Sequence, residues 1–144
     1  MIIGSHQTSE FIQGEAGDDE LHGRGGRDFL IGGLGNDFIS LGSGGSLALG
    51  DSGHGSLGPD EPGDDVMLGG SDSEDDLRGE KGDDVIRGRG KDDYLEGDEG
   101  NDQLIGGGRD DRIEAQDDER DLVDGRTATT SATWTRSTRC STAR

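Results

Sequence analysis

Apolar residues recur every nine positions along most of this chain. With the register set on the segment 32–40, which reads GGLGNDFIS, nine-residue windows follow one another, interrupted by one extra residue at Pro59 and a second in the window that starts at Gly69. Only 26% of the chain is apolar, yet the eighth position is apolar in every window. These expected core residues are Ile12, Leu21, Leu30, Ile39, Ala48, Leu57, Met67, Leu77, Ile86, Leu95, Leu104, Ile113 and Leu122.

The rest of each window predicts a turn followed by a very short strand. Glycine recurs at positions one, two and four, as expected where the backbone must adopt conformations closed to other residues. Positions seven to nine form a three-residue strand in which only the eighth side chain points inward, because side chains alternate between faces. One window turns the chain through half a circuit, so windows two apart stack. The pattern therefore predicts an all-β solenoid of parallel strands.

The sixth position of most windows is an aspartate. Stacked windows would place these carboxylates in two rows, with neighbours roughly 4.8 Å apart at normal strand spacing. Two unit charges at that distance repel by about 1 kcal/mol in water and by more near a protein surface. Divalent cations between successive coils would convert that repulsion into coordination. The expected ligand carboxylates are Asp19, Asp28, Asp37, Asp65, Asp75, Asp84, Asp93, Asp102 and Asp111.

Calcium is the expected cation, because it takes six to eight hard oxygen ligands. Carbonyl oxygens freed by the tight turns would complete its shell, and the turn residues expected to bind the metal are Gly32, Leu34, Gly35, Gly82 and Gly100. Carboxylates two windows apart predict about five or six Ca²⁺ ions. The expected pairs are Asp19 with Asp37, Asp65 with Asp84, Asp84 with Asp102, Asp75 with Asp93, Asp93 with Asp111 and, more weakly, Glu10 with Asp28.

Some windows depart from the pattern. Ser46 and Gly55 replace the aspartate in the middle, so the irregular segment 41–59 is either two half-coils without metal or a looped-out stretch. Arg120 stands at the sixth position of the last window, as in a terminal capping repeat. Lys91 and Arg109 replace the fourth-position glycine, and their charge would weaken calcium binding nearby.

The last part of the chain, residues 124–144, has a different composition. From Arg126 onward it contains neither acid nor glycine and is rich in threonine. Codons for Asp-Gly-Asp-Asp read one nucleotide late can spell Thr-Ala-Thr-Thr, so we hypothesise a shifted reading frame near Gly125, which the coding DNA would test. We expect this tail to be disordered, with Trp134 outside the core.

Charge and composition exclude several classes of protein. A net charge of −19 over 144 residues disfavours nucleic acid and anionic membranes as partners. With 29 glycines, the calcium-free chain could be a disordered acidic polymer. The start of the chain lacks the features of a secretory signal peptide, no segment predicts membrane insertion, and the single Cys140 excludes an internal disulfide.

No catalytic constellation stands out in the sequence. His6, His22 and His54 are isolated, and neither a nucleophile elbow nor a phosphate-binding loop is present. We therefore expect no enzymatic activity from this chain.

Residues 5–123 resemble the RTX, or hemolysin-type, calcium-binding repeat family, most closely at 32–40, 79–87 and 97–105. The resemblance implies a right-handed parallel β-roll that binds calcium between coils, folds after export and serves a secreted, extracellular protein as a secretion or folding module. The tail has no recognisable export signal of that family. The alternatives are a calcium-stiffened structural or adhesive surface module presenting Phe29, Phe38 and Tyr94, or a fragment of a larger secreted hydrolase or toxin. The surface or protein partner is unknown.

Overall fold

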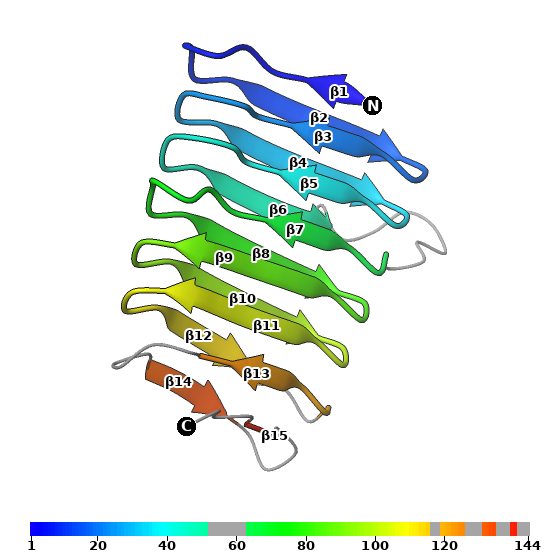
Figure 1. The fold of residues 1–144 in the computed structure, drawn as a ribbon. Coiled ribbons are helices and arrows are strands. Elements are labelled where there is room, and N and C mark those ends of the chain that lie inside the picture. The colour runs from blue at the N-terminus through cyan, green and yellow to red at the C-terminus, as the bar shows by residue number, and fades with distance from the viewer. Residues whose placement is uncertain (52–62, 116–118, 126–130, 135–138, 141–144) are drawn as a thin grey trace.

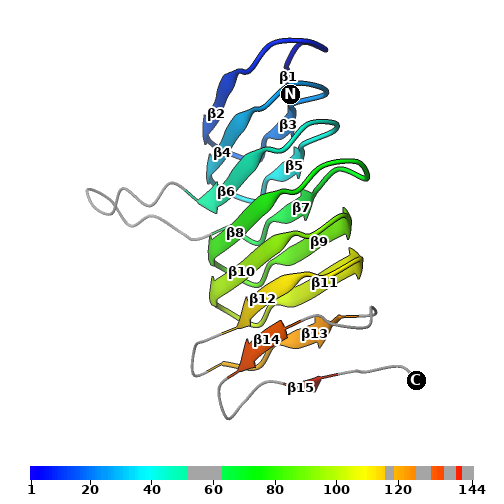
Figure 2. The same cartoon turned by 90° about the vertical axis from the view of Figure 1, so that its left-hand side faces the viewer.

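Two parallel β-sheets lie face to face and form a single solenoid (Figures 1 and 2). The computed structural model describes residues 1–51, 63–115, 119–125, 131–134 and 139–140. The chain alternates between the two sheets, so strands of odd number form one sheet and strands of even number the other. The all-β architecture of parallel strands predicted from the nine-residue pattern is confirmed.

The odd sheet has eight strands in the order of the chain. They are β1 (Ile2–Ile3), β3 (Glu20–His22), β5 (Phe38–Ser40), β7 (Val66–Leu68), β9 (Val85–Gly90), β11 (Gln103–Gly108), β13 (Leu122–Asp124) and β15 (Arg139–Cys140). The even sheet has seven strands. They are β2 (Phe11–Ala16), β4 (Phe29–Leu34), β6 (Leu47–Asp51), β8 (Asp76–Lys81), β10 (Tyr94–Glu99), β12 (Arg112–Ala115) and β14 (Ser131–Trp134).

Many strands are longer than the three residues expected. β10 begins at the seventh position of one window and continues through the first three positions of the next, where Asp98 takes a left-handed φ of 65° and still pairs with Glu80. Strand pairing thus runs into the turn. The reason is that neighbouring coils bend at the same place, so their backbones stay parallel and in register there.

The core is a stack of apolar side chains between the sheets. Eleven of the thirteen expected core residues are buried there. Leu57 lies outside the described residues. The prediction for Leu122 is wrong: this side chain is 43% exposed, while the neighbouring Val123 is fully buried and Val123 pairs with Leu104. The register has slipped by one residue in the last window, which has no glycine to fix its turn.

The irregular segment 41–59 is partly inside the roll. Residues 47–51 form β6, and Ala48 is buried in the core. β5 pairs directly with β7, so no described strand lies between β6 and β7. The connection between these two strands is termed the long turn, and its residues 52–62 lie outside the described part. One of the two irregular windows is therefore a half-coil, and the other adds no described strand.

The described part of the chain beyond residue 125 consists of two short strands. β14 pairs with β12 and β15 pairs with β13, so both sheets continue by one strand beyond residue 125. The other tail residues and the side chain of Trp134 lie outside the described part, and the predictions made for them remain predictions. Among the described residues, no helix is long and apolar enough to cross a membrane.

Candidate metal centre

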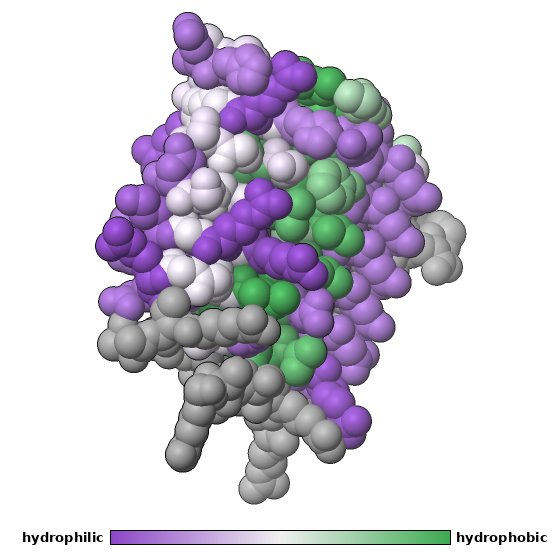
Figure 3. Space-filling model, in the orientation of Figure 1, coloured by the Kyte–Doolittle hydropathy of each residue, from purple (hydrophilic) through white to green (hydrophobic). Residues whose placement is uncertain are grey.

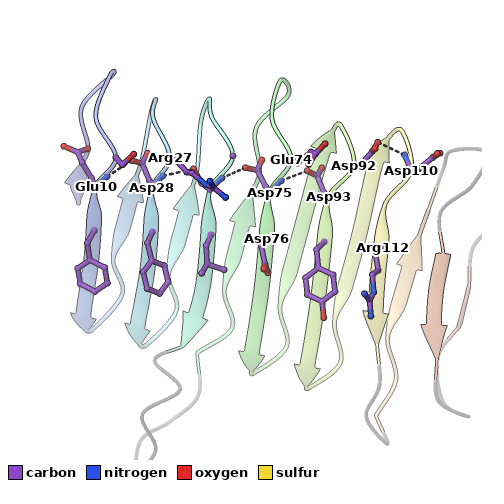
Figure 4. Close-up of a pocket in the computed structure, with 17 residues that line it drawn as sticks. Glu10, Arg27, Asp28, Glu74, Asp75, Asp76, Asp92, Asp93, Asp110 and Arg112 are labelled. Carbon is purple, nitrogen blue, oxygen red and sulfur yellow. Dashed lines mark hydrogen bonds between the residues drawn. The ribbon is translucent and has the colours of Figure 1, made fainter.

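Two rows of acidic side chains run along the solenoid, one at each edge. Each member immediately precedes a strand, so the register of the sheets aligns the members from coil to coil. The odd ladder, which precedes strands of the odd sheet, consists of Asp19, Asp37, Asp65, Asp84, Asp102 and Asp121. The even ladder consists of Glu10, Asp28, Ser46, Asp75, Asp93 and Asp111, and Figure 4 shows part of it along the ends of the even strands.

Hydrogen bonds connect the members of each ladder. The backbone N–H of one member donates to a side-chain oxygen of the member one coil later. In the odd ladder, Asp65 donates to Oδ1 of Asp84 over 2.8 Å, and Asp84 donates to Oδ1 of Asp102 over 2.9 Å. In the even ladder, Asp75 donates to Oδ1 of Asp93 over 2.9 Å. One oxygen of each carboxylate after the first member of a ladder is thereby committed to the fold.

In most ladder residues, the second carboxylate oxygen is buried and accepts no hydrogen bond from the described residues. Within the described residues, no hydrogen-bond donor reaches the Oδ2 atoms of Asp28, Asp37, Asp65, Asp84, Asp93 and Asp111. Asp75 is an exception because its Oδ2 accepts from the backbone N–H of Gly70 over 2.7 Å. A buried anionic oxygen without a partner is costly, so a row of them favours the binding of a positive counter-charge.

Backbone carbonyls lie beside these free oxygens, at the first-position glycines. A methyl group on Gly88 would lie 2.5 Å from Oδ2 of Asp93 and 2.8 Å from the carbonyl oxygen of Gly106, one coil later. At Gly23, the corresponding distances are 2.6 Å to Oδ2 of Asp28 and 2.7 Å to the carbonyl of Leu41. Only glycine fits here, because a side chain would occupy the space between the carboxylate and the next coil.

Burial raises the pKa of the ladder carboxyls, and their like-charged neighbours raise it further. The pKa is about 6 for Asp37, about 7 for Asp93, about 8 for Asp65 and about 9 for Asp84. Burial also raises the pKa values of Asp28, Asp75 and Asp111. Hydrogen bonds from the backbone of the preceding coil oppose the shift without cancelling it. The middle of the odd ladder therefore holds the least favourable negative charges of the set.

The donor set matches a hard divalent cation. Carboxylate and carbonyl oxygens are the ligands that calcium prefers. No three acidic or histidine side chains of the described residues converge on one point. Side chains alone would not hold an ion in this geometry, and backbone carbonyls have to supply the remaining oxygens. His22, one of the isolated histidines, instead contacts Glu20 over 2.9 Å.

The turn carbonyls expected to bind metal differ in their surroundings. Those of Gly32, Gly35 and Gly82 face the glycines of neighbouring coils at Gly14, Gly63 and Gly100, along the same edge as the odd ladder. The carbonyl of Leu34 accepts a hydrogen bond from Gly17 N–H over 2.7 Å, so one of its lone pairs is already used. For Gly100, the structure shows a tight backbone contact with Gly82.

The even ladder is interrupted at Ser46. This residue replaces an aspartate, and Leu41 replaces the first-position glycine of the same turn. Leu41 is fully buried and belongs to the core. The two substitutions are complementary, because an apolar side chain enters the turn that lacks a carboxylate. Cation binding at this rung is therefore disfavoured.

All six expected carboxylate pairs lie on successive coils of one ladder, including Glu10 with Asp28. The structure adds two pairs that the sequence pattern missed. Asp37 donates its N–H to Asp65 across a separation of 28 residues, because the long turn lies between them. Asp102 donates to Asp121, which occupies the place expected for Arg120. The marker that could have revealed Asp121 is the apolar Val123 two residues later.

Comparison with known families agrees with this geometry. The profile of the RTX calcium-binding nonapeptide repeat matches four copies, at residues 7–45, 70–104, 78–113 and 96–119, and these ranges together cover more than half of the chain. A search of curated proteins found no significant match. The repeat and the solenoid together imply calcium binding. The chain therefore belongs to the family of RTX calcium-binding nonapeptide repeats.

Proposed function

We propose that this chain is a calcium-dependent β-roll whose coils are clamped together by calcium ions along both ladders. The observation that carries the proposal is the row of buried Oδ2 atoms without hydrogen-bond donors beside first-position glycines. Each ion would neutralise carboxylates on two successive coils and would take carbonyl oxygens from the turns. The six pairs expected from the sequence and the two pairs added by the structure are the candidate intervals.

Calcium binding would control folding. The glycine-rich chain loses much conformational entropy on ordering, and its core is only one side chain wide per half-coil. Ions that bind the folded and not the unfolded chain shift the equilibrium by mass action. We expect a midpoint on the order of 0.1 to 1 mM, the range of extracellular calcium modules. Such a chain would stay unfolded at low calcium and fold after export, in the role of a secreted folding or secretion module.

A matched pair of substitutions tests the ladder. Asp84→Asn keeps the size of the side chain and an oxygen to accept from Asp65 N–H, but it removes the buried charge. Asp83→Asn removes the same charge from the exposed neighbouring position. Calorimetric calcium titration should show a several-fold weaker midpoint and fewer ions for Asp84→Asn, and little change for Asp83→Asn. Equal responses of the two variants would reject the buried ladder as the binding site.

A second candidate function is adhesion, and a groove favours it. The groove has a volume of about 1060 Å³ and runs along the even ladder over the first residues of the even strands (Figure 4). Phe11, which is 62% exposed, packs edge-on against Phe29 at a ring distance of 5.4 Å on its wall. Calcium-dependent retention on immobilised polysaccharides, lost when both phenylalanines become serine, would support this function. Retention that is unchanged in that variant would reject the groove.

A further inference from the structure

The outward side of β5, β7, β9, β11 and β13, here called the odd face, carries an apolar stripe. Its apolar side chains are half-buried or exposed, and they are Phe38, Val66, Leu68, Val85, Ile105 and Leu122. Strand pairing sets Phe38, Val66 and Val85 side by side on successive coils. Figure 3 shows hydrophobic residues gathered along the middle of this face. In a chain that is only 26% apolar, such a stripe favours a binding surface.

The outward face of the even sheet differs, because its charged residues pair with one another. The guanidinium of Arg78 donates to the two carboxylate oxygens of Asp76 over 2.9 and 3.0 Å and lies 3.6 Å from Glu96 on the next strand. Arg112 forms an ion pair with Glu114 on its own strand. The C-terminal half of the even face is thus neutralised within the chain, whereas the odd face presents apolar side chains at the same coils.

Two rows of turn residues flank the odd face. The start row consists of the residues directly before the ladder aspartates, and hydrogen bonds from backbone N–H groups to side-chain oxygens hold it in register from coil to coil. Its members are Asp18, Asn36, Asp64, Asp83 and Asn101. The end row consists of the second residues of the turns that follow the odd strands. Its members are Arg24, Gly42, Gly70, Arg89 and Gly107.

The charges of the two rows agree coil by coil. The coils of β3 and β9 have an exposed aspartate in the start row and an exposed arginine in the end row, whereas the coils of β5 and β11 have asparagine and glycine. The coil of β7 is the exception, with Asp64 but Gly70, and there Arg89 leans over from the next coil and donates to the carbonyl of Gly69 over 3.4 Å. Among the described residues, Arg24 and Arg89 form no ion pair.

Opposite charges at the two ends of one strand are complementary to a second copy of the same face. We propose that the odd face is a homodimer interface, in which two copies pack face to face about a two-fold axis parallel to the solenoid axis. This rotation keeps each coil at its height and exchanges the start row with the end row. Arg24 then faces Asp18 of the partner subunit, and Arg89 faces Asp83 of the partner subunit. A two-fold axis along the strands would set acid against acid instead.

Sedimentation velocity of the full chain tests the dimer. Bound calcium keeps the roll folded under the proposed function and reduces its net charge of −19, so the measurement uses saturating calcium, with a reductant because of Cys140. The wild type should sediment as a dimer. Leu68→Lys should raise the dissociation constant about tenfold or more. Leu49→Lys is the matched control, because Leu49 is an equally half-buried leucine on the outward face of the even sheet, and it should leave the dimer unchanged.

A mixing experiment tests the charge pattern. Arg24→Glu with Arg89→Glu makes both rows acidic, and these turns accept glutamate because Glu15 and Glu80 already have left-handed φ angles of 82° and 78° at the same turn position. Asp18→Lys with Asp83→Lys makes both rows basic. Each double variant alone should be monomeric, whereas an equimolar mixture of the two should form a heterodimer.

The outcomes separate this inference from the proposed function. A wild-type chain that stays monomeric at about 1 mM overturns the dimer, whether or not calcium has folded it. Far-UV circular dichroism of the same samples shows whether calcium-dependent folding has failed as well. Equal weakening of the dimer by Leu68→Lys and Leu49→Lys overturns the assignment to the odd face. Double variants that dimerise alone overturn the pairing of the two rows, as does a mixture of folded variants that stays monomeric.

Discussion

At the scale of single residues, the ladder aspartates have two different oxygens. Oδ1 accepts a backbone hydrogen bond, as Asp93 does from Asp75, and fixes the spacing of the coils. Oδ2 is buried without a donor. The fold therefore brings together negative groups that only a proton or a cation can satisfy, and two predictions follow at this scale.

The first concerns pH in the absence of calcium. Folding raises the pKa of Asp65 to about 8 and that of Asp84 to about 9, from an ordinary value of 3.8, chiefly through burial. Both groups hold their proton more tightly in the folded state, so protonation stabilises the fold. This contribution is complete below the ordinary pKa and disappears as pH rises through about 8 to 9.

The calcium-free chain should therefore be more ordered at mildly acidic pH than at alkaline pH. Far-UV circular dichroism in the presence of a chelator measures this dependence. With calcium the trend reverses, because the cation competes with the proton for the same oxygens. An increase in calcium-free order as the pH rises would show that these carboxyls are not buried as described.

The second prediction compares two glycines of one turn. A methyl group on Gly106 would overlap Oδ2 of Asp111 and lie 2.8 Å from its Cγ, whereas one on Gly108 would meet only the carbonyl of Arg89 at 3.5 Å. Gly106→Ala should cost about 1 to 3 kcal/mol of stability in saturating calcium and weaken calcium binding. Gly108→Ala should be nearly neutral. Urea unfolding with calcium present measures both, and similar losses would contradict the described turn.

At the scale of elements, Val123 is the residue of β13 whose side chain is buried in the core. Val123→Ala should destabilise the calcium-loaded protein by about 1 to 2 kcal/mol by leaving a small cavity. Leu122→Ala, on the exposed side of the same strand, should change stability by about 0.5 kcal/mol or less. The two urea midpoints decide the register of the last described coil. A larger loss for Leu122→Ala would restore the register expected from sequence alone.

Sequence alone predicts the elements wherever glycines fix the turn. Between Gly79 and Gly106, the nine-residue pattern places the start of each strand, each core residue and each ladder aspartate where the structure has them. It fails at β13, because the turn before it has no glycine, and it misses the pairing of Asp37 with Asp65 across the long turn. The burial of Asp51 at the end of β6 was missed for another reason: it depends on neighbouring coils, which a local pattern does not describe.

At the scale of the whole molecule, the two edges of the solenoid differ in charge. The turns before the odd sheet carry acids beyond the ladder, such as Asp18, Asp64 and Asp83, and Figure 3 shows a hydrophilic margin along that edge. The turns before the even sheet carry more basic residues, namely Arg24, Arg27, Arg89, Lys91 and Arg109, whereas the described turns before the odd sheet carry Lys81 and Arg120. The chain has a net charge of −19, and cations bound at the odd edge would relieve the most repulsion between negative charges.

Calcium titration of the intact chain, followed by far-UV circular dichroism, tests the central claim most directly. The account predicts a disordered spectrum with chelator at neutral pH and a cooperative change to β-structure with a midpoint on the order of 0.1 to 1 mM calcium. Magnesium at the same concentration should be much less effective, because it is smaller and demands near-ideal octahedral geometry. A spectrum that stays unchanged up to about ten millimolar calcium, well above that range, would contradict the account.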